Sequence, residues 1–188
     1  MDEELCSQPL LTNNAIWYGV LRKLGQDREA AIVREALAHR RCGLYGDYPG
    51  AERPDPLGLA LGLENGLFGE GDLPEILRLL REVQTPYGVT IQCKHNAYSG
   101  PERDVIARTR GIVVWPFVVG YVVLALRRAR YNLDTRSEIF SDLREVLNLN
   151  TAAMAKLGTY EWYDQATGMG WGSPEQGWSA ALRVNALL

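Results

Sequence analysis

GIVVWPFVVGYVVLAL, the run from Gly111 to Leu126, is the most apolar stretch of the chain and decides the class of fold. It has sixteen residues, whereas a membrane-spanning helix needs about 20. Arg110, Arg127 and Arg128 flank it, and a proline and a glycine interrupt it. We therefore expect a helix buried inside a protein rather than a membrane span. A helix that is apolar on nearly every side must be wrapped by other helices, which predicts an all-α domain.

Apolar periodicity and end signals predict about six helices, joined in sequence as antiparallel hairpins within a single domain over residues 1–188. Capping residues, capping boxes and glycines set the expected boundaries. The capping boxes pair Asp72 with Glu75, Thr135 with Glu138, and Ser173 with Gln176. The expected helices are Thr12–Leu24, Asp27–His39, one from Asp72, Gly111–Tyr131, Thr135–Leu157 and Ser173–Leu188, with a short additional helix left open at Leu57–Glu64.

Two long segments outside these helices carry aromatic and charged side chains. Thr85–Arg110 is irregular, apart from a short strand that Gly88–Gln92 could form. Loops of this length in compact domains are functional or disordered. The second segment is Tyr160–Gly172. We expect both segments to lie at the same end of the helices, where they can share a site.

Charge and cysteine content exclude several classes of function. A net charge of −3 and a pI of about 5.5 argue against a nucleic-acid partner. Cys6, Cys42 and Cys93 cannot all pair, and His39 and His95 are the only histidines, so we expect no metal site and no cofactor. The acidic N-terminus lacks the basic and apolar regions of a signal peptide. A cytoplasmic protein with reduced thiols and no membrane contact is expected.

The segment Tyr160–Ala181 (YEWYDQATGMGWGSPEQGWSAA) is the richest in chemistry. Aromatic faces stack on the C–H faces of sugar rings, and carboxylates beside them can bind hydroxyls or act in acid–base catalysis. Its glycines allow the backbone to approach a ligand closely. Composition alone leaves two readings open: a carbohydrate site, or aromatics that pack the end of a helical domain with solvated acids.

The motif Y-E-x-Y-D-x-x-T-G-x-G-x-G over Tyr160–Gly172, followed by Gly177-Trp178-Ser179-Ala180-Ala181, resembles the closing motif of six-hairpin glycosidases. The resemblance is closest to glycoside hydrolase family 63, the α-glucosidase I and mannosylglycerate hydrolase group. Gln176–Ser179 is also similar to the amylo-α-1,6-glucosidase domains of glycogen debranching enzymes. Arg110–Pro116 resembles the family's R-G-x-x-W-x run, which opens a barrel helix, and Thr85–Val89 resembles its T-P-x-G segment.

This resemblance implies a fold and an activity. The fold would be about half of an (α/α)6 toroid, its C-terminal part, with long loops at one end. The activity would be inverting hydrolysis of α-linked glucosides or mannosides, with Glu161 as the general base that activates water. The family's general acid is an aspartate from an upstream segment. No segment of this chain resembles that one. The resemblance therefore implies a partner, either another chain or a missing N-terminal half that completes the toroid.

Six further residues are candidates for binding the carbohydrate substrate, and four of them have an alternative role or environment. Trp115 and Trp178 could stack on sugar or belong to the core. Gln176 could bind a hydroxyl or close its capping box, and Arg110 could bind a substrate hydroxyl or carboxylate or stay a solvated charge. The full set of candidates is Trp115, Arg110, Trp178, Gln176, Tyr163 and Trp171.

Other loop residues fit surface roles better. Asp47 and Asp104 are interpreted as surface acids, and His95 has no visible partner in the sequence. The rival function is a non-catalytic helical module that binds carbohydrate or protein and lacks a general acid. A helical-repeat scaffold is a weaker alternative, because no period of 34 or 40 residues is present.

Overall fold

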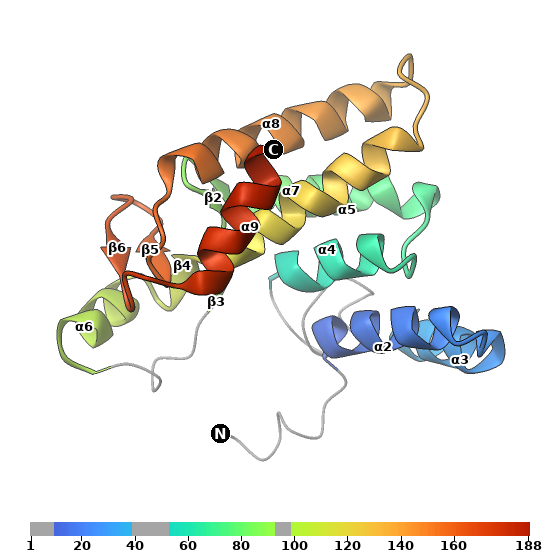
Figure 1. The fold of residues 1–188 in the computed structure, drawn as a ribbon, viewed down its shortest axis with the longest axis horizontal. Coiled ribbons are helices and arrows are strands. Elements are labelled where there is room, and N and C mark those ends of the chain that lie inside the picture. The colour runs from blue at the N-terminus through green and yellow to red at the C-terminus, as the bar shows by residue number, and fades with distance from the viewer. Residues whose placement is uncertain (1–9, 39–52, 93–98) are drawn as a thin grey trace. The chain divides into compact units, whose positions relative to one another are not determined.

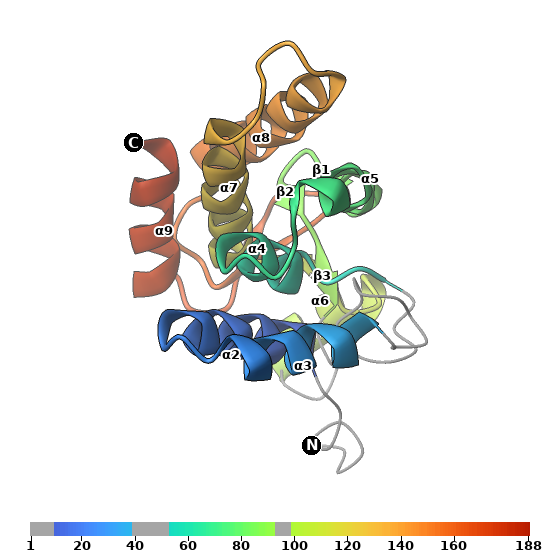
Figure 2. The ribbon, with the colours of Figure 1, turned by 90° about the vertical axis from the view of Figure 1, so that its right-hand side faces the viewer.

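The computed structural model describes residues 10–38, 53–92 and 99–188. Where the sequence led us to expect a single domain, the chain groups into two compact units, residues 1–76 and 77–188. Figures 1 and 2 show the helices and strands of both from two directions. Each unit is described by itself below.

The first unit is a set of short helices around α2. Its elements are α2 (Leu11–Lys23), α3 (Asp27–Ala38), α4 (Pro56–Glu64), the 3-10 turn η1 (Glu70–Asp72) and the start of α5 (Leu73–Glu82). Helix α2 packs against both α3 and α4. Thr12 is not the N-cap that the sequence suggests. It lies inside α2, and its Oγ1 donates to Asp55 Oδ2 at 2.8 Å. Asp55 in turn caps α4 by accepting from the backbone N–H of Leu57.

The second unit contains three packed helices and the strands beside them. Helix α7 packs against α8 and α9, and its buried positions include Val118, Val122 and Leu126. A Cβ at Gly120 would lie 2.8 Å from Leu182 Cβ, so this glycine sets the close approach of α7 and α9. The elements after α5 are β1 (Gln84–Thr85), β2 (Gly88–Val89), β3 (Ile91–Gln92), α6 (Gly100–Arg108), β4 (Ile112–Val114), α7 (Pro116–Tyr131), α8 (Glu138–Lys156), β5 (Trp162–Asp164), β6 (Gly170–Trp171) and α9 (Gly177–Leu187).

Two small antiparallel sheets accompany the helices. The larger has the order β3-β4-β5-β6, with Val113 opposite Asp164 and Trp162 opposite Trp171. In Figure 1 its strands and α6 lie at the end of α7 and α8 that is opposite the α7–α8 connection. The smaller sheet is the β1–β2 hairpin. The buried side chain of Asn150 fixes it to α8, because it accepts from the backbone N–H of Val89.

The described residues are mostly helical, in eight α-helices, but the all-α class holds only roughly because of the two sheets. No described helix has both the length and the apolar character that crossing a bilayer requires.

The expected helix Gly111–Tyr131 is wrong at its start. Residues 112–114 are strand β4, and α7 begins with Pro116 at its first position. The residue before a proline is driven to extended backbone, as Trp115 is with φ −105° and ψ 117°. The β-branched run Ile112-Val113-Val114 therefore pairs as a strand, and the helix starts only after it.

Two other helix starts also differ from the sequence prediction. The N-cap of α8 is Ser137, two residues after Thr135, and its side chain accepts from the N–H of Phe140. Helix α9 begins at Gly177, not at Ser173. Residues 173–176 instead pair with the backbone of residues 159–161 and cannot also be helical. Helix α6 was not expected at all.

Candidate functional site

The two long segments come together, which confirms the prediction that they lie at the same end of the helices. Strand β5, from the second segment, pairs with β4, which follows the first. The hydroxyl of Tyr87 donates to the carbonyl of Thr167 at 3.2 Å. Arg108 forms an ion pair with Asp164 at 2.7 Å. The candidate site is thus built from chain segments that lie far apart in sequence.

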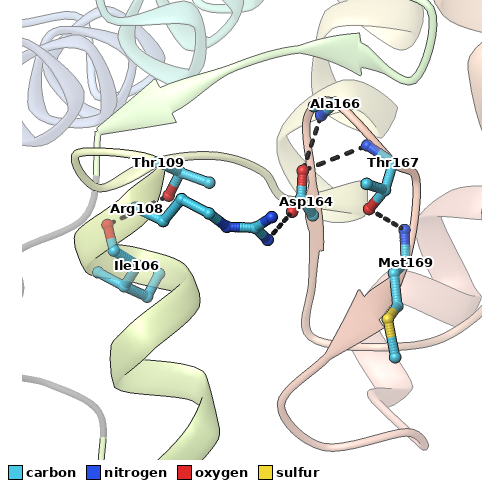
Figure 3. Close-up of polar contacts among 7 residues, drawn as sticks. All are labelled: Ile106, Arg108, Thr109, Asp164, Ala166, Thr167 and Met169. Carbon is cyan, nitrogen blue, oxygen red and sulfur yellow. Dashed lines mark hydrogen bonds and ion pairs between the residues drawn. The ribbon is translucent and has the colours of Figure 1, made fainter.

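Asp164 is a buried acid with a structural role (Figure 3). It is 1% exposed, and its Oδ2 accepts from Arg108 Nη2. Its Oδ1 accepts from the backbone N–H of Ala166 at 2.8 Å and of Thr167 at 3.2 Å. These bonds close the turn between β5 and β6 and leave the carboxylate no access to a ligand. This structural role could have been predicted from the sequence, since an aspartate side chain in a turn commonly accepts a hydrogen bond from the backbone N–H two residues later.

Glu161, the expected general base, is half-buried and held by its own hairpin. Its backbone N–H donates to the carbonyl of Ser173 at 2.9 Å, and its Oε2 accepts from the N–H of Ser173 at 3.4 Å. A Cβ at Gly172 would lie 2.6 Å from Oε2, and Gly172 has a φ of 73°. Glycine is therefore required there, and the carboxylate lies across the turn instead of extending into bulk solvent.

Gly170 and Gly172 leave space that other side chains of the hairpin fill. Gly170 lies in β6 and Gly172 directly follows this strand, and neither has a side chain to fill the space above its backbone. The ring of Tyr160 lies where a Cβ on Gly170 would be, at 2.4 Å, and Glu161 occupies the same place over Gly172. The Tyr160 ring and the Glu161 carboxylate thus pack over two glycines that are two residues apart in the chain.

Tyr163 is not available to a substrate, which corrects the sequence prediction. It is 5% exposed, and its hydroxyl oxygen accepts from the backbone N–H of Tyr160 at 3.3 Å. Tyr160 is 40% exposed and meets the Tyr163 ring edge-on, with 6.0 Å between ring centroids. The sequence pattern could not show which of the two tyrosines is buried, because the chain bends just before β5 and the alternation of a strand does not extend to Tyr160.

Trp115 and Trp171 pack in a core cluster. The cluster consists of Trp162, Val105, Ile106 and Val113, with Trp115 and Trp171 packed against it. Trp171 stacks on the fully buried Trp162, with the two rings 5.9 Å apart and 17° from parallel. Trp162 is fully buried in this cluster, whereas Glu161 is half-buried over Gly172. The core alternative fits both residues better than stacking on sugar beside Glu161.

Trp178 is the tryptophan that the structure leaves most available. It is 62% exposed near the start of α9, so the core alternative does not hold for it. Its ring lies 6.1 Å from the ring of Phe117, which in turn lies 5.1 Å from Trp115. Gln176 is the N-cap of α9, but its side chain makes no capping bond, so the expected capping box is wrong. Its backbone N–H donates to the carbonyl of Thr159 at 2.9 Å.

Arg110 is exposed and ends α6 in a left-handed conformation, with φ 55°. It is the only non-glycine residue with positive φ in the described ranges. The N–H groups of Arg110 and Gly111 donate to the carbonyls of Ala107 and Ile106, which is the Schellman pattern. Glycine usually occupies this position, because the left-handed conformation costs other residues about 1–2 kcal/mol. Its backbone position therefore has a structural explanation independent of substrate.

Several residues singled out in the sequence lie outside the described residues: Cys6, His39, Cys42, Asp47, Cys93 and His95. Asp104 is exposed on α6, as a surface acid would be. Within the described ranges, no group of three or more His, Cys, Asp or Glu side chains is placed to hold a metal ion.

No protein-family model matches the sequence, and no curated protein matches it either. The resemblance to the six-hairpin glycosidases therefore depends on the motif residues alone.

Proposed function

We propose that this chain is part of an inverting glycoside hydrolase that acts on α-linked glucosides or mannosides, with Glu161 as the general base. The observation that carries the proposal is the fixed position of Glu161 beside an exposed aromatic ring. Its carboxylate is held over Gly172 by the Ser173 N–H, and Tyr160, which is 40% exposed and precedes it in the chain, packs over Gly170. A carboxylate next to a ring that can stack on a pyranose is the chemistry that glycoside hydrolysis uses.

In this mechanism Glu161 accepts a proton from the attacking water while a second carboxylic acid protonates the leaving oxygen. The two groups lie about 6.5–9.5 Å apart in inverting enzymes, which leaves room for the water. Ser173 donates to one oxygen of Glu161 and so orients the carboxylate. Asp164 is not the acid, because Arg108 and two backbone N–H groups bind it. The acid would come from another segment.

The same proposal includes a partner. We propose that the described helices belong to about half of an (α/α)6 toroid and that another chain, or an N-terminal half, supplies the rest. Exposed apolar side chains in each unit support this proposal, because an open half leaves faces that the missing hairpins would cover. The most exposed apolar side chains on α2, at its C-cap and on α9 are Ile16, Trp17, Leu24, Trp178 and Val184.

A second candidate is a non-catalytic module that binds carbohydrate or protein. The favouring observation is that Asp164, the nearest acid along the strand from Glu161, is neutralised by Arg108. Without an acid from elsewhere, the exposed Tyr160 and Trp178 would bind a ligand and no bond would be cleaved.

An activity screen on aryl α-glucosides and α-mannosides, with sedimentation on the same sample, separates the two candidates. Release of the aryl group with inversion at the anomeric carbon supports the hydrolase. Binding of methyl α-glycosides without turnover, in a sample of fixed oligomeric state, supports the module. Neither turnover nor binding would overturn both.

A further inference from the structure

We propose that Tyr160 is the aromatic platform of this site, the ring on which a pyranose stacks beside Glu161. The inference builds on the proposed function and assigns to Tyr160 the contact that the sequence pattern gave to Tyr163, Trp115 and Trp171. Those three residues are buried or packed against the Trp162 cluster. Tyr160 combines an exposed ring with a position next to the candidate base.

The glycine pattern of the hairpin fixes the ring where it is needed. Gly168, Gly170 and Gly172 alternate, and the side chains that lie over them are those of Tyr87, Tyr160 and Glu161. Each of these side chains occupies the place of a missing Cβ. The Tyr160 ring therefore lies against bare backbone at Gly170, and the residue remains 40% exposed.

Contacts around the ring hold it in a single place. Tyr163 meets it edge-on, and the hydroxyl of Tyr163 accepts from the Tyr160 backbone N–H. Thr159, the preceding residue, is hydrogen-bonded to the segment beside it, to Pro174 through its side chain and to Gln176 through its backbone. A side chain that is ordered before binding loses little conformational entropy when a ligand arrives, which favours affinity.

The chemistry of this face selects a class of ligand. A flat ring binds the apolar C–H face of a pyranose, and the adjacent carboxylate accepts hydrogen bonds from hydroxyls or from the hydrolytic water. The arrangement fits a neutral sugar better than an anionic ligand, since a carboxylate follows the ring directly in the chain.

The experiment measures binding of methyl α-D-glucopyranoside, methyl α-D-mannopyranoside and maltose by calorimetry, on the full chain in its native assembly. Tyr160→Ala removes the platform, and we expect affinity to fall about fivefold or more, from the loss of ring-face burial. Tyr160→Phe keeps the ring and restores most of the affinity relative to Tyr160→Ala. Tyr131→Ala, which removes an 89% exposed tyrosine at the far end of α7, serves as the matched control.

Gly170→Ala gives an independent test that leaves the tyrosine in place. The added methyl group would meet the ring at 2.4 Å, so it displaces Tyr160 and should weaken binding as Tyr160→Ala does. Thermal unfolding of each variant shows whether the fold survives. If the wild-type chain binds a sugar and Tyr160→Ala binds it equally well, the platform assignment is wrong and the proposed function stands. If the wild type binds none of the three sugars, the proposed function fails, and this inference fails with it.

Discussion

The ion pair of Arg108 with Asp164 joins the two segments of the candidate site. Variants that remove different parts of it should lower the free energy of unfolding by different amounts. Asp164→Ala deletes the buried carboxylate and leaves the N–H groups of Ala166 and Thr167 without their acceptor. An unsatisfied buried donor costs about 1–3 kcal/mol. Ala166 and Thr167 are exposed, so water can replace part of the hydrogen bonding that their N–H groups lose. We expect a total destabilisation of about 2 kcal/mol, within that range.

Two matched variants divide this loss into parts. Asp164→Asn keeps an oxygen for the two N–H groups and removes only the charge, for which we expect about 1 kcal/mol. Arg108→Gln removes the cation, whose side chain is 64% exposed, so solvent screening limits the cost to about 1 kcal/mol or less. The predicted loss of stability is largest for Asp164→Ala, smaller for Asp164→Asn and smallest for Arg108→Gln.

Urea unfolding followed by tryptophan fluorescence measures all three variants, since four of the five tryptophans lie in the second unit. The double variant Arg108→Gln/Asp164→Asn should cost less than the sum of its single changes, because they remove the same interaction. Strict additivity, or a larger loss from Arg108→Gln than from Asp164→Ala, would refute the reasoning.

Three further changes test other parts of the structure. Gly168→Ala forces a side chain into a left-handed backbone at φ 70° and within 2.3 Å of the Tyr87 ring, so thermal unfolding should show a loss of about 1–3 kcal/mol; an unchanged midpoint would contradict this contact. Trp162→Ala empties the centre of the sheet's core cluster and should cost about 3–5 kcal/mol in urea unfolding, whereas a loss below about 1 kcal/mol would mean that the residue is not core. Arg81 has its pKa raised, first by its hydrogen bond to Glu145, so its stabilisation is fully present below the unfolded-state pKa and is lost only above the raised value. Arg81→Gln should therefore cost the same at pH 6 as at pH 9, about 1 kcal/mol or less for a surface pair, and a marked difference between the two would count against this ion pair.

The sequence predicted the helices with strong periodicity and clear end signals. The start of the second helix at Asp27 and the end of α7 at Tyr131 are confirmed, and the optional short helix at 57–64 is present as α4. Each boundary depends on local residues: Asp55 caps α4, and Pro116 starts α7 at its first position. Local chemistry is visible in sequence, so these elements could be found.

What the sequence could not predict depends on contacts between distant segments. Strand β4 pairs with β5, with Val113 opposite Asp164, and these two residues are 51 positions apart in the sequence. Ser173–Gln176 looked like a helix start, but the backbone of Thr159 and Glu161 holds it extended. Such tertiary hydrogen bonds override a local capping signal. No window of sequence contains them.

Within the candidate site, the sequence indicates the hairpin but not which of its side chains are exposed. The aromatic and acidic composition of Tyr160–Ala181 predicts a candidate site in this segment. The bend before β5 then decides that Tyr160 is exposed and Tyr163 buried. The alternating glycines at 168, 170 and 172 were visible in the sequence, and they could have indicated that other side chains pack against that strand.

The most direct test of the central claim is the turnover of Glu161→Gln, measured beside its sugar affinity in the same preparation of the assembled enzyme. Glutamine keeps the shape of the side chain and an oxygen for the Ser173 N–H, but it cannot accept the proton of the attacking water. General-base assistance is worth about 10²–10⁴-fold, so kcat on an aryl α-glycoside should fall by that factor while the affinity for a methyl α-glycoside stays within about twofold. Unchanged turnover in Glu161→Gln would contradict the assignment of Glu161 as the base.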